Sequence, residues 1–205
     1  YPGVDASISK RVPDFARDEE HPRILFVGRL VRRKGADLLV SAFARLASEL
    51  PTARLDIVGD GPELNGLQRL VEELHLGDSV IFYGALIGPE LWRRYAEASV
   101  LVLPSRESND DAEGFGTVFL EAAVFGVPSI GTRTGGIPEA VVNGFTGRLV
   151  AGDDVDGLKA AVKDLLENPS ERLRLGENAR TRVTGFSWEV STNQVLKFLR
   201  GKDGR

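Results

Sequence analysis

The sequence contains no cysteine and no methionine, and only two of its 205 residues are histidines. The lack of cysteine excludes disulfide bonds and thiolate metal sites. His21 and His75 lie far apart without metal-ligand spacing and are interpreted as surface residues. With so few histidines, a serine–histidine catalytic triad is not supported. Because the first residue is not methionine, we expect the chain to begin inside a longer sequence or to be processed.

Long hydrophobic runs and a strong excess of either charge are also missing. No apolar run approaches the ~20 residues that a membrane-spanning helix needs, and no signal peptide is recognisable. The net charge of −4 and the isoelectric point near 5.4 give no reason to expect nucleic acid as a partner. The expected location is therefore cytoplasmic. Hydrophobic residues make up 42% of the chain and charged residues 27%, which is ordinary for a globular protein with one sizeable core.

Strand and helix patterns alternate along the chain. Short apolar runs typical of buried strands cover residues 23–28, 54–59, 79–84, 100–104, 128–131 and 147–150. Helical spacing covers residues 34–50, 63–74, 89–98, a segment from about 117, 155–167, 170–183 and 188–199. The alternation predicts the α/β class, with a Rossmann-like, doubly wound parallel sheet of about six strands and helices on both faces. Residues 1–20 are polar and are interpreted as an irregular linker remnant, residues 21–186 as the domain, and residues 187–205 as a C-terminal helix and tail.

Turn residues and charged residues follow the predicted strands. These segments are Gly28-Arg29, Gly59-Asp60-Gly61-Pro62, Gly84-Ala85, Pro104-Ser105 and residues 132–136. In a parallel sheet they all lie at one edge, outside the carboxyl ends of the strands, where ligands bind. The segment at 59–62 is interpreted as a tight turn that caps the next helix.

Residues 113–121, with the sequence EGFGTVFLE, carry the strongest functional signal. Glu121 is the only charged residue from Gly114 to Thr132. Burying a lone carboxylate costs several kcal/mol unless hydrogen-bond donors are supplied, and a sugar diol offers two. The Gly-Phe-Gly turn at 114–116 precedes a predicted helix, whose free N–H groups and dipole attract phosphate, although a purely structural turn is the alternative. Glu113 lies ahead of this phosphate site, where a second hydroxylated group would bind.

Basic residues after the first strand suit a diphosphate. Arg29 can chelate a phosphate with two hydrogen bonds, and Lys34 adds a point charge. Arg32 and Arg33 are interpreted as the solvated start of a helix. The Asp-Val-Asp segment at 154–156 resembles a metal-binding motif, but its position at a helix start favours capping.

Three common motifs are absent from the sequence. No Gly-x-Gly-x-x-Gly follows the first predicted strand, so a nicotinamide site is poorly supported. Neither a phosphate-binding P-loop motif nor a Gly-x-Ser-x-Gly nucleophile motif is present. These three classes of site are therefore not supported by the sequence.

In combination, the motifs resemble the C-terminal domain of retaining glycosyltransferases of the GT-B type, glycosyltransferase family 4, also called glycosyl transferases group 1. The resemblance covers almost the whole chain, in order, through residues 26–35, 57–63, 80–84, 113–122, 135–147 and 186–188. The Glu-x7-Glu pair, the arginine and lysine at 29 and 34, and the Gly-Gly-Ile-Pro-Glu segment at 135–139 are specific in combination. The opening residues 2–5 resemble the family's segment just after the interdomain linker. The resemblance implies one half of a GT-B fold.

The resemblance also implies roles for individual residues. Arg29 and Lys34 would neutralise the leaving diphosphate of a nucleotide-sugar, and Glu113 would bind hydroxyls of the donor sugar; these three are the catalytic candidates. Glu121 would bind the ribose, the backbone at 115–117 the phosphate and sugar, and the turn at 84–86 the base. The implied substrate-binding residues are Gly28, Ala85, Leu86, Gly114, Phe115, Gly116, Thr117 and Glu121.

The function implied by the resemblance is transfer of a sugar, with retention of its anomeric configuration, to a glycan, polysaccharide or glycolipid. The donor would be a nucleotide-diphosphate sugar, with uridine or guanosine as the base, and no metal or other cofactor is expected. The expected partners are this donor, the acceptor and an N-terminal Rossmann domain that this chain lacks. The isolated domain is expected to be a monomer that binds donor without full activity, and the full-length enzyme to reach the inner face of the membrane. The alternatives are a non-catalytic nucleotide-sugar-binding module and, more weakly, a relative of glycogen phosphorylase or of an epimerase.

Overall fold

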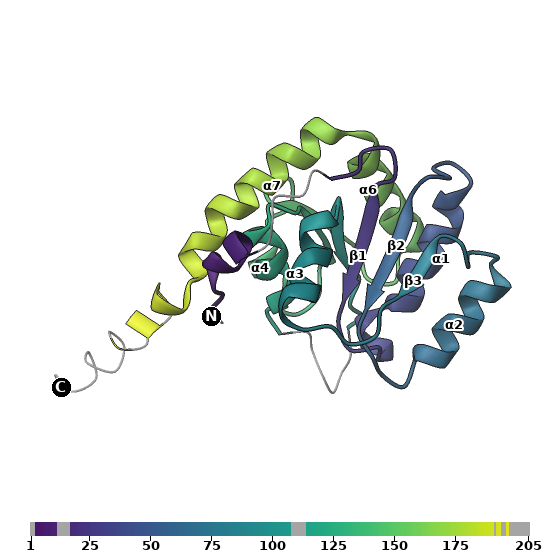
Figure 1. The fold of residues 1–205 in the computed structure, drawn as a ribbon, viewed down its shortest axis with the longest axis horizontal. Helices are drawn as coiled ribbons and strands as arrows, with labels where there is room; N and C mark the ends of the chain where they lie inside the picture. Colours follow the sequence, from purple (N-terminus) through teal and green to yellow (C-terminus); the bar gives the residue numbers. More distant parts are fainter. Residues whose placement is uncertain (1–2, 12–16, 108–113, 191, 194–195, 197–205) are drawn as a thin grey trace.

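A six-stranded parallel sheet forms the centre of the protein, with the strand order β3-β2-β1-β4-β5-β6 (Figure 1). The computed structural model describes residues 3–11, 17–107, 114–190, 192–193 and 196. The strands are β1 (Arg23–Val27), β2 (Arg54–Val58), β3 (Val80–Phe82), β4 (Val100–Leu103), β5 (Ser129–Thr132) and β6 (Gly147–Val150). The predicted α/β class and the Rossmann-like parallel sheet with helices on both sides are confirmed.

The central strands are apolar because both of their faces are covered. In β1, Ile24, Leu25 and Phe26 have no exposed surface, and the whole of β4 is buried as well. Strands buried on both faces have sequences that are continuous hydrophobic runs. This is why the strand positions were predictable to within about two residues from the sequence.

Seven α-helices have both of their ends among the described residues. They are α1 (Ala36–Ala47), α2 (Leu64–Glu73), α3 (Gly88–Glu97), α4 (Thr117–Val124), α5 (Ile137–Ala140), α6 (Val155–Glu167) and α7 (Pro169–Val183). The chain moves outwards from β1 to β3, returns to β4 and continues in the other direction to β6. Because crossovers between parallel strands are right-handed, α1 and α2 lie on one face and α3 and α4 on the other. Helix α6 packs beside α1, and α7 packs against α4 and α6 (Figure 1).

The first described segment is more ordered than expected. Residues Ala6–Arg11 form the 3-10 helix η1, which packs against α3 and α4. Val4 and Ile8 are buried, and the Val4 amide donates a hydrogen bond of 2.9 Å to the Phe186 carbonyl. The expectation of irregular structure is therefore wrong for Ala6–Arg11, because apolar side chains at Val4 and Ile8 reach the core. A linking role for residues 1–20 stays a prediction.

Two further differences concern helix boundaries. The helix expected from residue 34 begins at Ala36, because Gly35 adopts a left-handed conformation (φ 70°) between the 3-10 helix η2 (Arg32–Lys34) and α1. A Cβ atom on Gly35 would lie 2.1 Å from the Pro104 carbonyl oxygen, so the chain passes too close there for any side chain. At the other end, the 3-10 helix η3 (Thr184–Phe186) follows α7, and residues 188–190, 192–193 and 196 are helical. The helix expected over 188–199 thus lies partly outside the described residues.

None of the helices among the described residues combines the length and the apolar character needed to cross a membrane.

Glu171 joins the start of α7 to β6. Its carboxylate accepts hydrogen bonds from Arg174 (2.7 and 2.8 Å) and from Arg148 on β6 (2.9 Å). The hydrogen bonds from Arg174, opposed by desolvation and aided by Arg148, lower the pKa of Glu171 from 4.5 to about 2. A pKa that is lower in the folded state stabilises the fold above the unfolded pKa, and this stabilisation is lost as the pH falls through the folded pKa.

We expect Glu171→Gln to lower the free energy of unfolding near pH 7 by roughly 0.5–1 kcal/mol, a value reduced by solvent screening of a partly exposed ion pair. The difference from the parent protein should shrink as the pH falls from about 4.5 towards about 2, because the parent carboxylate then becomes protonated. Urea unfolding curves over this pH range measure the difference in the free energy of unfolding. Glu177→Gln, which changes an exposed residue on the same helix, is the control. A difference that does not change with pH would contradict the assignment.

Candidate functional site

The topological switch point of the sheet lies between β1 and β4. These strands are neighbours in register, with Ile24 beside Val100 and Leu25 beside Leu101. The chain leaves β1 towards β2 and leaves β4 towards β5, so the two loops diverge at the carboxyl ends of the strands. Ligands of doubly wound sheets bind in the crevice that this divergence opens. The described site residues in the loops after β1 and β4 therefore lie at this switch point.

The loop after β1 is supported from behind by the turn after β2. Gly59 has φ 144°, and a Cβ atom there would lie 1.8 Å from the Gly28 carbonyl oxygen. Leu30 donates a backbone hydrogen bond of 2.8 Å to Asp60, and the Asp60 carboxylate accepts one of 2.7 Å from the Gly61 amide. The interpretation of residues 59–62 as a tight turn is confirmed. Its capping role is wrong, because α2 begins without a side-chain cap and Asp60 binds the turn itself.

The predicted phosphate-binding cations lie on this supported loop. Arg29 directly follows Gly28 at the end of β1 and its side chain is exposed, whereas Lys34 ends the 3-10 helix η2 and is half-buried. Arg32, on the same short helix, is exposed, in agreement with the interpretation of a solvated position, whereas Arg33 is half-buried, which differs from it. The structure thus brings both Arg29 and Lys34 to the carboxyl edge of β1.

Arg106, which sequence reasoning missed, joins three segments behind the crevice. Its guanidinium donates to both carboxylate oxygens of Asp37 (2.6 and 2.7 Å), to Asp153 (2.7 Å) and to the Arg32 carbonyl (2.9 Å). Its backbone amide donates to the Arg33 carbonyl at 2.7 Å. Although partial burial opposes the shift, hydrogen bonding and charge from Arg106 lower the pKa of Asp37. We call Arg106 and these partners the Arg106 clamp; it fixes η2, and with it Lys34, to the exit of β4.

The N-terminus of α4 forms the opposite side of the crevice. Gly116 precedes it in a left-handed conformation (φ 72°), and no side chain caps the helix. Gly114 and Thr117 are exposed. A Cβ atom on Gly136 would lie 2.8 Å from the Gly114 carbonyl oxygen, so the loop after β5 supports this turn. Free amide groups at a helix N-terminus bind anions, and this one lies at the same edge of the sheet as Arg29.

Phe115 fixes the middle of the Gly-Phe-Gly turn. Its ring lies 5.3 Å from that of Phe186, and the Arg182 guanidinium lies 4.8 Å above the Phe186 ring. Because the Phe186 carbonyl also accepts the Val4 amide, the turn is connected both to the first described segment and to η3. The phenylalanine side chain is therefore structural.

Glu121 has a hydrogen-bond partner inside the protein. The Tyr95 hydroxyl donates to Oε2 of Glu121 at 2.6 Å, and Tyr95 itself has no exposed surface. Burial, followed by the charge and hydrogen bond of Glu121, raises the pKa of Tyr95 well above its usual value. Tyr95, on α3, thus supplies one of the hydrogen-bond donors that the sequence led us to expect for the Glu121 carboxylate. Sequence reasoning missed Tyr95 because nothing in the local pattern around residue 95 indicates a partner on another helix.

The remaining predicted residues divide into three groups. Exposed Ala85 and half-buried Leu86 follow β3 at the same edge of the sheet, after Gly84, whose carbonyl accepts the Gly59 amide at 2.8 Å. Half-buried Gly28 directly follows β1. Glu113 lies outside the described residues, so the structure adds nothing to its predicted role.

The Asp-Val-Asp segment at 154–156 caps a helix, as interpreted from the sequence. Oδ1 of Asp154 accepts a hydrogen bond of 2.8 Å from the Gly157 amide at the start of α6, and Asp156 pairs with Arg45. Across the part of the chain that the structure describes, no three or more histidine, aspartate or glutamate side chains are grouped so that they could hold a metal ion.

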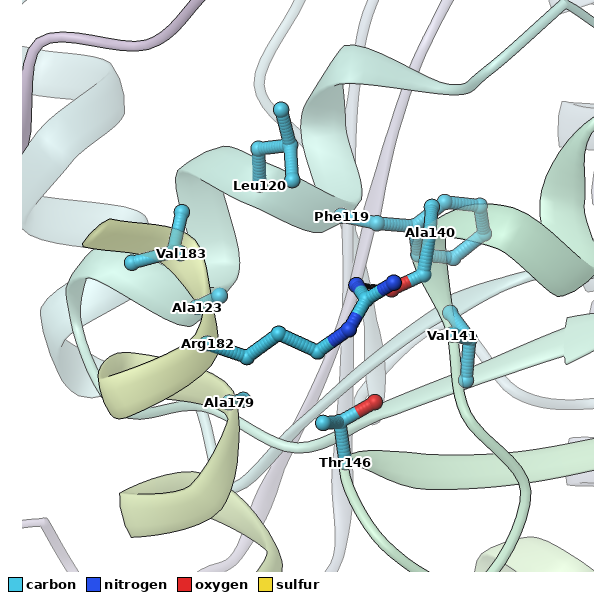
Figure 2. A pocket seen from close by; sticks show the side chains of 9 residues that line it. All are labelled: Phe119, Leu120, Ala123, Ala140, Val141, Thr146, Ala179, Arg182 and Val183. Atoms are coloured by element: carbon cyan, nitrogen blue, oxygen red, sulfur yellow. Dashed lines mark hydrogen bonds between the residues drawn. The ribbon is translucent and has the colours of Figure 1, made fainter. Parts of the chain in front are cut away.

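A small hollow lies elsewhere, between α4, α5 and α7 (Figure 2). Its polar side chains are bonded to the backbone: Arg182 donates to the carbonyls of Ala140 (3.0 Å) and Glu139 (2.6 Å), and Thr146 accepts the Val142 amide (2.9 Å). None of the predicted site residues lines it. The hollow is best understood as part of the contact that holds α5 against α7, and the sheet edge remains the candidate site.

The sheet order and the parallel strand direction define a Rossmann-like, doubly wound domain. Residues 8–182 match the protein family described as Glycosyl transferases group 1. The chain belongs to that family, as its sequence motifs indicated, and its sheet is the Rossmann-like half of a GT-B fold.

Three relatives illustrate the similarity. The GDP-mannose-dependent alpha-(1-6)-phosphatidylinositol monomannoside mannosyltransferase of Mycolicibacterium smegmatis is 36% identical over 211 residues, covering 98% of this chain and 55% of that protein. The solved sucrose-phosphate synthase of Thermosynechococcus elongatus is 34% identical, with a TM-score of 0.79 over 98% of this chain and 49% of its own. Anabaena HepE, solved in complex with UDP, shares the fold at a TM-score of 0.83 and 21% identity, over 98% of this chain and 56% of its own. The chain thus spans about half the length of the curated relatives it matches.

Proposed function

We propose that this chain is the donor-binding half of a retaining glycosyltransferase of family 4, which binds a nucleotide-diphosphate sugar at the carboxyl edge of its sheet. The observation that carries the proposal is the position of two basic residues, Arg29 and Lys34, at the switch point where the uncapped N-terminus of α4 also lies. Positive side chains and free helix amides at one crevice suit a diphosphate.

Each group has a defined task in this proposal. Arg29 and Lys34 hold the diphosphate and stabilise the negative charge that grows on it as the sugar leaves. The amides around Gly116 hold the phosphate next to the sugar, and Glu113 binds sugar hydroxyls. Glu121 accepts the ribose hydroxyls, and the turn at 84–86 reads the base. Because side-chain cations offset the diphosphate charge, the proposal requires no metal.

The rest of the reaction requires a second domain. We propose that an N-terminal Rossmann domain binds the acceptor, which is a glycan, polysaccharide or glycolipid. The 36%-identical relative is named for GDP-mannose and for a phosphatidylinositol monomannoside, which supports a GDP-sugar donor and a glycolipid acceptor. The UDP in Anabaena HepE supports the alternative base. Such an enzyme would work in the cytoplasm or at the inner face of the membrane, and this domain on its own would be a monomer.

Nucleotide binding by residues 1–205 tests the proposal. We expect UDP or GDP to raise the melting temperature and to bind by calorimetry, and the matching monophosphate to bind more weakly. A ligand present at 100 times its dissociation constant stabilises the folded state by about 2.7 kcal/mol. If none of UDP, GDP and ADP at millimolar concentration shifts the unfolding transition, the proposal is wrong.

Transfer by the full-length natural protein separates an enzyme from a non-catalytic binding module. Incubated with donor and a glycolipid acceptor, the enzyme should form a product whose anomeric configuration, followed by NMR, equals that of the donor sugar. Tight binding without any transfer would favour the binding module.

A further inference from the structure

The contact between Tyr95 on α3 and Glu121 on α4 joins a buried residue to the candidate ribose site. The phenol has no exposed surface, whereas Glu121 is only partly buried. The 2.6 Å hydrogen bond runs from the Tyr95 hydroxyl to Oε2 of the carboxylate. Hydrogen bonds from a hydroxyl to an ionised carboxylate are short and strong. The bond thus fixes one end of a carboxylate whose sequence neighbours on α4 are apolar.

The tyrosine ring is itself held in place. It stacks on the ring of Phe125, at the end of α4, with a centroid distance of 5.8 Å and an interplanar angle of 11°. The neighbouring Arg94 lies 4.7 Å above the Tyr83 ring and donates to the Tyr83 hydroxyl at 3.0 Å. Helix α3 is therefore fixed both to α4 and to the exit of β3, where residues 84–86 follow. A ring held in this way gives its hydroxyl little freedom to move.

A carboxylate has two oxygens and about four acceptor positions. Tyr95 occupies one position on Oε2 of Glu121. Acceptor positions on both oxygens remain for two hydroxyls of a ribose diol. Without the tyrosine, rotation of the carboxylate would spread these positions over several directions, because the terminal torsion of a glutamate side chain is soft.

We propose that Tyr95 is a positioning residue, which holds the Glu121 carboxylate in the orientation that accepts both ribose hydroxyls of the nucleotide. This inference rests on the proposed function, and it adds a residue to the site that touches no ligand. It predicts that Tyr95 controls the preference for a ribose over a sugar that lacks both hydroxyls. A tyrosine that only fills the core would affect every nucleotide equally.

Tyr95→Phe removes the hydroxyl and keeps the ring. Calorimetry compares the nucleoside diphosphate that binds the parent protein with its 2′,3′-dideoxy form. We expect affinity for the ribonucleotide to fall roughly 3–10-fold, the range for one lost hydrogen bond, while affinity for the dideoxynucleotide stays the same. Tyr83→Phe is the matched control, because it removes a hydroxyl bound to α3 but not to Glu121, and it should not change the preference.

A cycle with Glu121→Gln tests whether Tyr95 acts through the carboxylate. In the parent protein, Tyr95→Phe should reduce the ribose preference. In the Glu121→Gln background it should add little to the reduction already present, because the effects of substitutions within one hydrogen-bond network are not additive. Equal losses for both nucleotides, or full additivity, would overturn the inference.

A second measurement needs no substitution and therefore does not depend on folding of a variant. The chain has three tyrosines, so selective ¹³C labelling of tyrosine Cζ gives three NMR signals. The Tyr95 signal should shift on addition of the ribonucleotide and not of the dideoxynucleotide. Equal behaviour with both nucleotides would overturn the inference alone. A parent protein that binds neither would overturn the proposed function and the inference with it.

Discussion

Replacing Arg29 or Lys34 by alanine should weaken binding of a nucleoside diphosphate by about 10- to 150-fold. Each change removes one charge-assisted contact, which typically contributes about 1.5–3 kcal/mol. Both side chains lie at the carboxyl edge of β1, one exposed and one half-buried. In an enzyme with both domains, the loss in turnover should exceed the loss in affinity, because negative charge on the leaving group increases in the transition state. Isothermal calorimetry measures the affinity.

Arg32→Ala is the matched control for this experiment. Arg32 belongs to the same 3-10 helix and is exposed, so its removal subtracts one positive charge from the same region without removing a proposed contact. Its effect should stay within about threefold, the level of a screened surface charge. If Arg29→Ala and Lys34→Ala bind the nucleotide as well as Arg32→Ala, the phosphate assignment is wrong.

Gly59→Ala should lower the free energy of unfolding by about 3 kcal/mol or more. The new Cβ atom would lie 1.8 Å from the Gly28 carbonyl oxygen, and the φ of 144° already disfavours any side chain. Since a backbone atom cannot move aside as a side chain can, the loop that carries Arg29 must shift. The melting temperature should fall by about 6–12 °C, and nucleotide affinity should fall with it.

Gly66→Ala is a control that should not lower the free energy of unfolding. Gly66 lies in α2 and is exposed, and a Cβ atom there would meet nothing within 4 Å. Alanine favours a helix over glycine by up to about 1 kcal/mol, so this variant should be as stable as the parent protein or more stable. A small effect of Gly59→Ala, comparable with that of Gly66→Ala, would contradict the close approach between the two loops.

Most of the fold could be predicted because its central strands are buried on both faces. Runs such as residues 24–27 and Val100–Leu103 are apolar throughout and are followed by turn residues, which makes them easy to recognise. Helix α5 was missed because its four residues include a proline and are too few to show a helical period. The 3-10 helix at Ala6–Arg11 was missed because its order comes from tertiary packing of isolated apolar side chains.

The residues of the candidate site could be predicted only in part, and their roles stay predictions. Arg29 and Gly116 were identifiable because each lies directly after a strand or before a helix. Tyr95 and Arg106 were not, because their partners are distant in sequence: Glu121 is 26 residues from Tyr95, and Asp37 is 69 residues from Arg106. Such pairs arise only when the right-handed crossovers bring separate units together.

The Arg106 clamp has a consequence for exchanging loops between this domain and its relatives. One guanidinium joins the segments that contain Arg32, Asp37 and Asp153. A loop transplanted from a relative would therefore arrive without the acceptors that its neighbours require, and would leave a largely buried positive charge poorly compensated. Chimeras that exchange residues 29–37, 104–107 and 151–154 as one unit should be better tolerated than chimeras that exchange any one of them. The three loops would accordingly be inherited together more readily than separately.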